Sequence, residues 1–161
     1  MSEPLLVLID GNAIVHRAYH AFLNTKTLTV SKTGEIVSAV YGFAQMLLKT
    51  INDVKPTHWA IAFDKAAPTF RHEMYTEYKA HRPKMPDELV KQFGRVKELV
   101  AAFNIPVFEI DGFEADDVIG TLSRQASEQG VDTVIVTGDG DFACLVDYLK
   151  KRSDADPALF I

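Results

Sequence analysis

The chain has 161 residues, with 17 Lys or Arg against 22 Asp or Glu, so its formal net charge at pH 7 is −5. This length fits one domain, and the apolar fraction of 47% excludes a disordered chain. No apolar run is long enough to span a membrane, the N-terminus lacks the basic start of a signal peptide, and a single cysteine, Cys144, excludes an internal disulfide. We therefore expect a cytoplasmic protein from a reducing compartment.

The charges are distributed unevenly along the chain. Residues 1–64 hold five acids and five bases, residues 65–97 hold eight bases and four acids, and residues 98–149 hold eleven acids and one base. The negative total by itself argues against a nucleic-acid partner, because proteins that bind phosphates are usually basic. The asymmetry is more informative than the total, since it places a basic segment between a neutral start and a very acidic later part.

Apolar runs of strand length alternate with segments of helical spacing. Residues 5–9 are continuously apolar, as in a strand buried on both faces of a parallel sheet, and 37–54 have apolar residues at helical spacing. In chain order we expect a strand at 5–9, a helix at 13–22, a loop at 24–36, a helix at 37–54, a strand at 58–63, a basic segment at 65–86, a helix at 87–103, a strand at 105–110, a helix at 114–129, a strand at 132–136 and a helix at 142–149. Asp87 is the expected N-cap of its helix, and Gly130 ends the next one. The alternation predicts an α/β fold, with a mainly parallel sheet of four or five strands flanked by helices.

Each predicted strand is followed by carboxylates. Parallel α/β sheets have their sites at the carboxyl ends of the strands, so these acids are expected to converge on one rim. In chain order they are Asp10, Asp64, Asp111, Glu114, Asp116, Asp117, Asp139 and Asp141. Packed carboxylates repel one another unless a cation neutralises them, and an all-oxygen ligand set suits Mg²⁺ or Mn²⁺. The pattern therefore predicts a divalent-metal site.

Each acid also has a structural explanation. A single Asp in a strand-to-helix turn is usually a cap, acids in a first helical turn interact favourably with the helix dipole, and Asp111 before Gly112 is most simply a turn residue. The conjunction favours a site, because capping does not require an acid after every strand. His16 and His20 lie four residues apart on a helix without a third zinc ligand, so a surface or packing role is expected for them.

A site of several carboxylates and Mg²⁺ indicates phosphoryl chemistry, since two ions can activate water and stabilise the leaving oxygen. Several other chemistries lack their residues. The chain has no Walker loop, no G-x-G-x-x-G and no nucleophile elbow around a serine. The turn Asp10-Gly-Asn12 also lacks the second Asp that an aspartyl-phosphate phosphatase needs.

The basic segment at 65–86 mixes cations with aromatic rings. Recurrence at three- and four-residue spacing lets one helical face present Arg71, Tyr75, Tyr78, Lys79 and Arg82. Cations neutralise phosphates, and Tyr rings stack on bases without reading sequence. The alternative is an amphipathic surface helix whose rings pack inward while its cations extend to solvent. The nearby acidic rim favours nucleic acid, because cations must hold a polyanion against carboxylates.

The order and spacing of these motifs resemble one family. They are the strand ending in Asp10-Gly-Asn12, the run from Tyr78 to Arg82, Glu114-Ala-Asp-Asp117 and Gly138-Asp-Gly-Asp141. Together they resemble the 5′-nuclease domain family of bacterial DNA polymerase I. The resemblance implies a PIN-like (resolvase-like) fold and a 5′–3′ exonuclease or flap endonuclease that uses two divalent ions. It implies DNA with 5′ ends, flaps or single-strand/duplex junctions as partner, and neither a membrane nor a nucleotide cofactor.

The resemblance also implies roles for individual residues. Lys79 and Arg82 match the helical-arch cations that hold the scissile phosphate, and Tyr78 matches the arch aromatic that stacks on DNA. Arg17 and Arg71 match positions of phosphate contact. The acidic metal-site positions match Asp10, Asp64, Glu114, Asp116, Asp117, Asp139 and Asp141. Without these seven, 15 of the 22 acids remain against 17 bases, so the negative total no longer argues against nucleic acid.

The resemblance does not extend over the last residues or to the second half of the family's domain. We therefore expect a nuclease domain at 1–146, with the arch near 65–86, and a divergent tail at 147–161. Truncation is expected to leave the last edge of the sheet unpaired and to remove ligands of the second ion. Three functions stay open: a Mg²⁺-dependent 5′ nuclease, a non-catalytic nucleic-acid-binding fragment of such a domain, and an unrelated phosphatase with an acidic site.

Overall fold

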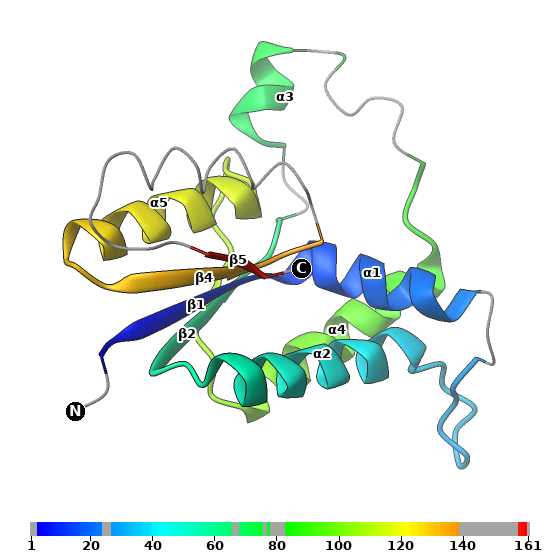
Figure 1. The fold of residues 1–161 in the computed structure, drawn as a ribbon. Helices are drawn as coiled ribbons and strands as arrows, with labels where there is room; N and C mark the ends of the chain where they lie inside the picture. Colours follow the sequence, from blue (N-terminus) through cyan, green and yellow to red (C-terminus); the bar gives the residue numbers. More distant parts are fainter. Residues whose placement is uncertain are drawn as a thin grey trace.

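The computed structural model describes residues 3–23, 27–65, 68–75, 77 and 83–138, together with the backbone of 158–160. Figure 1 shows one sheet with helices on both faces, and a short helix, α3, that stands apart from the sheet. The helices and strands are β1 (Leu5–Asp10), α1 (Gly11–Leu23), α2 (Ser38–Val54), β2 (His58–Ala62), α3 (Phe70–Met74), α4 (Asp87–Ala102), β3 (Val107–Phe108), α5 (Ala115–Glu128), β4 (Asp132–Val136) and β5 (Ala158–Phe160).

The sheet has the strand order β3-β2-β1-β4-β5, and its paired strands run parallel. β1 lies at the centre, where Ile9 has Ile61 of β2 on one side and Val136 of β4 on the other. The chain first adds strands outward from β1 to β3 and then crosses back to place β4 on the opposite side of β1. Such a reversal of strand order is where open α/β sheets bind their ligands. The predicted α/β class is confirmed.

The side chains of β1 alternate between two apolar cores, as the two-residue period of a strand requires. Val7 and Ile9 face α1, α2 and α4, where they join the core that contains Phe43 and Val96. Leu8 points to the other face and packs against Ile119 of α5. Figure 1 shows this arrangement, with α5 on one side of the sheet and α2 and α4 on the other. Burial on both faces explains why the strand has no polar residue before Asp10.

Most predicted helices and strands are confirmed within one or two residues, and two details are wrong. Asp87 is the first residue of α4 rather than its cap, since Pro86 occupies the N-cap position. Its charge still lies in the first turn, where the helix dipole favours it. The strand expected at 105–110 is shortened to β3, because Ile105 donates its N–H back to Val100 at the end of α4. Gly130 follows α5 with φ of 70°, in accord with its expected role.

The prediction that one helix carries the cations of the basic segment is also wrong for the first half of that segment. α3 ends at Met74, and Tyr75 has the extended backbone angles φ −133° and ψ 101°. No residue of α3 is buried, so the helix lacks the packed apolar face that stabilises most protein helices. The remaining predicted members of that face, Tyr78, Lys79 and Arg82, lie outside the described residues.

The edge of β4 is not left unpaired, contrary to the expectation from truncation. β5 lies parallel to it, with Val134 beside Ala158 and Val136 beside Phe160. The tail expected to diverge therefore adds a strand to the sheet. The helix expected at 142–149 lies outside the described residues. In the part of the chain that the structure describes, no helix has the length and apolar character needed to cross a membrane.

Candidate active site

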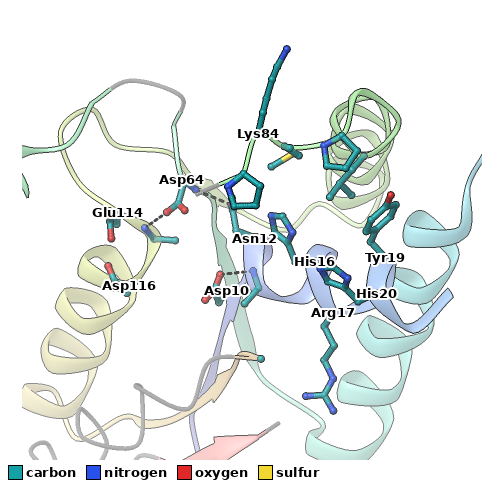
Figure 2. A pocket seen from close by; sticks show the side chains of 17 residues that line it. Asp10, Asn12, His16, Arg17, Tyr19, His20, Asp64, Lys84, Glu114 and Asp116 are labelled. Carbon is teal, nitrogen blue, oxygen red and sulfur yellow. Dashed lines mark hydrogen bonds between the residues drawn. The ribbon is translucent and has the colours of Figure 1, made fainter. Parts of the chain in front are cut away.

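A cavity of about 780 Å³ lies at the carboxyl ends of the central strands. Four carboxylates line one part of it, Asp10, Asp64, Glu114 and Asp116. The side chains of α1 and of the segment before α4 line another part, namely His16, Arg17, Tyr19, His20 and Lys84. Figure 2 shows Asp64, Glu114 and Asp116 on one side and the α1 residues on the other, with Asp10 between them and Lys84 above. The structure thus brings together acids that are up to 106 positions apart at the switch point of the sheet.

Asp10 is the last residue of β1 and is 7% exposed. Its Oδ1 accepts the Ala13 N–H of α1 at 3.0 Å, and its Oδ2 accepts the Thr137 hydroxyl at 3.1 Å. The first contact is the capping role that a single Asp in such a turn usually has. Burial nevertheless raises the pKa of Asp10, and the charges of Asp64 and Asp116 raise it further, against the two hydrogen bonds that lower it. The ionised form of Asp10 is therefore under-compensated by the protein.

Asp64 follows β2 and connects the strand ends to α5. Its Oδ1 accepts the Ala115 N–H at 2.7 Å, at the start of that helix. Its own backbone N–H donates to Asn12 Oδ1 at 2.9 Å. Through these two bonds, which Figure 2 draws as dashed lines, the turns after β1 and β2 and the first turn of α5 hold a fixed relative position.

The start of α5 places two further acids at the cavity. Glu114 is the N-cap residue and is only 5% exposed. Asp116 lies in the first helical turn, and partial burial raises its pKa, followed by the charges of Asp117 and Glu114. The nearby Arg71 guanidinium lowers the pKa of Asp116, but less than these effects raise it. The neighbouring carboxylates thus disfavour the ionised form of Asp116, as the sequence pattern predicts for packed acids.

Asp117 does not line this cavity, although it was predicted among the same acids. Its two carboxylate oxygens accept both terminal nitrogens of Arg71, at 2.6 and 2.7 Å, and Oδ2 also accepts the Glu114 N–H at 3.0 Å. Asp111 lies elsewhere too, since it is a turn residue paired with Lys65 at 2.8 Å. Arg71, for which a phosphate contact is predicted, forms this bidentate pair with Asp117 in the structure.

The α1 side of the cavity contains the predicted Arg17 beside the Gly138 turn. A β-carbon on Gly138 would lie 3.5 Å from the Ala13 carbonyl oxygen and 3.7 Å from Arg17 Cδ. The rings of His16 and His20 are stacked with their centroids 6.4 Å apart, and His16 also packs against the edge of Phe93. The packing role expected for these histidines is confirmed for His16, but both rings also line the cavity.

Three residues of this region were not predicted from the sequence as site residues. Asn12 and Thr137 hydrogen-bond to Asp64 and Asp10, and both follow strand ends, which is the signal that would have found them. Lys84 lines the cavity, whereas the sequence pattern directed attention to the aromatic-flanked cations before it. The predicted Asp139 and Asp141 lie outside the described residues.

The donor chemistry of the site suits a hard divalent cation, because Asp10, Asp64, Glu114 and Asp116 offer only oxygen. Among the residues that the structure describes, no three His, Cys, Asp or Glu side chains form a group that could hold a metal ion. The described carboxylates thus match a divalent ion in kind, but they do not complete a coordination shell by themselves.

Comparisons with known proteins agree with this arrangement. The profile described as "5'-3' exonuclease, N-terminal resolvase-like domain" matches residues 5–155, and so continues into the tail. DNA polymerase I of Chloroflexus aurantiacus is 52% identical over 98% of this chain, and that of Bacillus subtilis is 42% identical over 87%. The match spans 16% of the length of each of these two relatives.

Solved structures show the same fold at low sequence identity. The T5 D15 protein co-crystallised with metal ions has a TM-score of 0.68 at 19% identity, covering 97% of this chain and 54% of its own. T5 5′-exonuclease with bound divalent metal ions (zinc) has a TM-score of 0.66 at 20% identity, with the same coverage. The catalytic core of Rad2 in complex with DNA substrate has a TM-score of 0.52 at 18% identity, covering 86% of this chain and 40% of its own. The expected PIN-like architecture is confirmed, and by its sequence match the chain belongs to the family of 5′–3′ exonuclease N-terminal, resolvase-like domains.

Proposed function

We propose that this chain provides the acidic site of a 5′ nuclease, which hydrolyses DNA phosphodiesters at 5′ ends or flap junctions. The observation that carries the proposal is the cavity at the switch point of the sheet. Carboxylates at the end of β1, after β2 and at the start of α5 line it together with Arg17 and Lys84. Cations beside a carboxylate cluster suit a polyanionic substrate that must approach a metal site. Family membership supports the same chemistry.

The proposed cofactor is Mg²⁺ or Mn²⁺, with two ions, as the resemblance to the 5′-nuclease family implies. Asp10, Asp64, Glu114 and Asp116 would hold them, with Asp139 and Asp141 as further predicted ligands, while the predicted Asp117 is paired with Arg71 outside the cavity lining. When bound, such ions lower the pKa of a water molecule and stabilise the leaving oxygen. The raised pKa values of Asp10 and Asp116 support the proposal, because a carboxylate that its neighbours leave uncompensated gains most from an added cation.

The chain's own cations would position the DNA. Arg17 and Lys84 line the cavity, and each would neutralise a phosphate of the strand that enters it. Lys79 and Arg82 are proposed to hold the scissile phosphate, and Tyr78 to stack on a base, as the resemblance implies. A DNA substrate also implies a cytoplasmic location, which we include in the proposal.

A second function is favoured by one specific observation. The described carboxylates form no group of three that could hold a metal ion. The chain would then bind single strands or junctions and at most one metal ion, without cleaving DNA.

A cleavage assay separates the two functions. The protein is incubated with a 5′-labelled flap substrate with and without Mg²⁺, alongside Asp116→Ala and the control Asp53→Ala. Asp53 pairs with Lys49 on the exposed face of α2. We expect Mg²⁺-dependent cleavage that Asp53→Ala preserves and that Asp116→Ala reduces by about a hundredfold, which corresponds to about 2.7 kcal/mol of transition-state stabilisation. Binding without cleavage would support the second function, and equal cleavage by all three proteins would refute the proposed site.

A further inference from the structure

The short helix α3, in the first half of the basic segment, contacts the residues around the start of α5, from Gly112 to Asp117. Phe70, the first residue of α3, donates its N–H to the Gly112 carbonyl at 3.1 Å. Its ring lies 5.8 Å from that of Phe113, centroid to centroid. Arg71 reaches Asp117 in the first turn of α5. These contacts hold α3 against the start of α5, because α3 has no buried residue of its own.

The Arg71–Asp117 ion pair is the strongest of these contacts by geometry. It is bidentate, with N–O distances of 2.6 and 2.7 Å, and Glu114 Oε2 lies 3.7 Å from the same guanidinium. The Arg71 and Asp117 side chains are 28% and 22% exposed, so water screens the pair less than a surface pair. The guanidinium also lies 4.7 Å from the centre of the Phe70 ring, which joins the ion pair to the aromatic contact.

This pairing removes both partners from the cavity. Asp116 lines the cavity, whereas Asp117 and Arg71 are absent from its described lining. Arg71 cannot offer its terminal nitrogens to a phosphate in the same bidentate geometry while Asp117 holds both of them. A positive charge beside Glu114 and Asp116 also offsets part of their mutual repulsion.

We propose that Arg71 is a positioning residue, which clamps α3 to the start of α5 through Asp117. The clamp fixes α3 beside the first turn of α5, which presents Glu114 and Asp116, and so it holds the described residues that precede the proposed DNA contacts Lys79 and Arg82 in the chain. The part of this inference that concerns DNA rests on the proposed function, whereas the clamp itself does not.

Hydrogen exchange tests the clamp without DNA or metal. The full chain is compared with Arg71→Gln, Asp117→Asn and the double variant, with exchange at the Phe70 and Tyr75 amides as readout. Both amides are bonded in or next to α3, to Gly112 and Arg71 respectively. Each single variant is expected to speed the exchange of both amides about tenfold, because the charge-assisted pair stabilises the closed state of this region against local opening. The double variant is expected to exchange no faster than either single variant. Unchanged exchange in Arg71→Gln, or additive effects, would overturn the clamp.

Two further variants serve as controls for the exchange experiment. Arg95→Gln removes another bidentate pair, with Glu35 at 2.8 and 3.1 Å, and should leave the Phe70 amide unchanged. Arg71→Lys keeps the charge but loses the planar fork, so it should give an intermediate rate. It also preserves the test if Arg71→Gln does not fold. Exchange in Arg71→Lys equal to that of the parent chain would count against the bidentate geometry.

The salt dependence of DNA binding distinguishes a clamp from a direct phosphate contact. Binding of flap DNA is measured in EDTA over a range of salt concentrations. The clamp predicts that Arg71→Gln and Asp117→Asn both weaken binding with an unchanged slope of log K against log salt. A lost phosphate contact would instead reduce the slope by about 0.9, and Asp117→Asn would not weaken binding. That second pattern would overturn the positioning role. If the parent chain binds no DNA, the proposed function fails, while the exchange experiment still decides the clamp.

Discussion

Gly11, the first residue of α1, lies so close to Phe63 that a β-carbon cannot be added without moving the ring. That carbon would lie 2.3 Å from Phe63 Cε1 and 2.6 Å from both Cδ1 and Cζ. Phe63 is 2% exposed and packs edge-on against Phe93 at 6.3 Å, so the ring has little room to move. Because Gly11 sits between Asp10 and Asn12, the displacement would also reach the acidic site.

The expected cost of Gly11→Ala follows from two opposing effects. Overpacking a well-packed core costs about 1–3 kcal/mol, and an overlap with three atoms of a buried ring lies toward the upper end. Replacing a helical glycine by alanine returns about 0.5–1 kcal/mol. We therefore expect Gly11→Ala to lower the free energy of unfolding by about 2 kcal/mol, which lowers Tm by roughly 4–8 °C in a chain of this size.

Gly94 in α4 provides the matched control, because a β-carbon there would meet nothing within 4 Å. Gly94→Ala should stabilise the protein by about 0.5–1 kcal/mol in the same urea titration. Phe63→Leu in the Gly11→Ala background should recover part of the loss, since the smaller side chain makes room for the methyl group. A Gly11→Ala protein as stable as the parent, or one that Phe63→Leu destabilises additively, would refute the reasoning from the close contact.

Three further outcomes are expected. Asp10→Asn should stabilise the metal-free protein at pH 7, because burial raises the pKa of Asp10 above its ordinary value of 3.8 and makes the ionised form costly, and the gain should vanish in urea titrations below about pH 4; a gain that is constant with pH would contradict this cause. Gln92→Leu should cost about 1–3 kcal/mol of unfolding free energy, since Gln92 Oε1 accepts the buried Ala39 N–H at 2.8 Å, and a neutral result would show that the N–H finds another acceptor. Lys84→Ala should weaken flap-DNA binding and reduce the salt slope by about 0.9, whereas an unchanged slope would place Lys84 away from the phosphates.

The layers of the fold could be predicted from sequence because burial leaves a direct pattern in it. The unbroken apolar run that became β1 reflects cores on both of its faces, and the helical spacing of α2 reflects its single buried side. The acids at the strand ends followed from topology alone, since parallel strands carry their carboxyl ends to one edge. Asp10, Asp64, Glu114 and Asp116 line the cavity together, as this topology predicts.

Other features depend on tertiary contacts that leave no periodic pattern. The spacing of Arg71 and Tyr75 is helical, yet α3 ends at Met74, and none of its residues is buried, so it lacks the packed face that stabilises most helices. The pairing of β5 with β4 joins residues more than twenty positions apart. The partner of Asp117 could not be inferred either, because Arg71 lies 46 residues away on a different element.

The acids of this chain show that one carboxylate can both cap a helix and belong to the site. The charge of its hydrogen-bond donors distinguishes a site acid from an acid with only a structural role. Asp10 caps α1 and accepts a hydroxyl, but both donors are neutral, and an ionised carboxylate keeps further lone pairs. Its pKa stays raised, so its negative charge remains to be compensated. Asp117 has a similar number of hydrogen bonds, yet a full guanidinium charge supplies two of them. Hydrogen-bond counts would treat the two residues alike, whereas charge compensation assigns Asp10 to the cavity and Asp117 to the clamp.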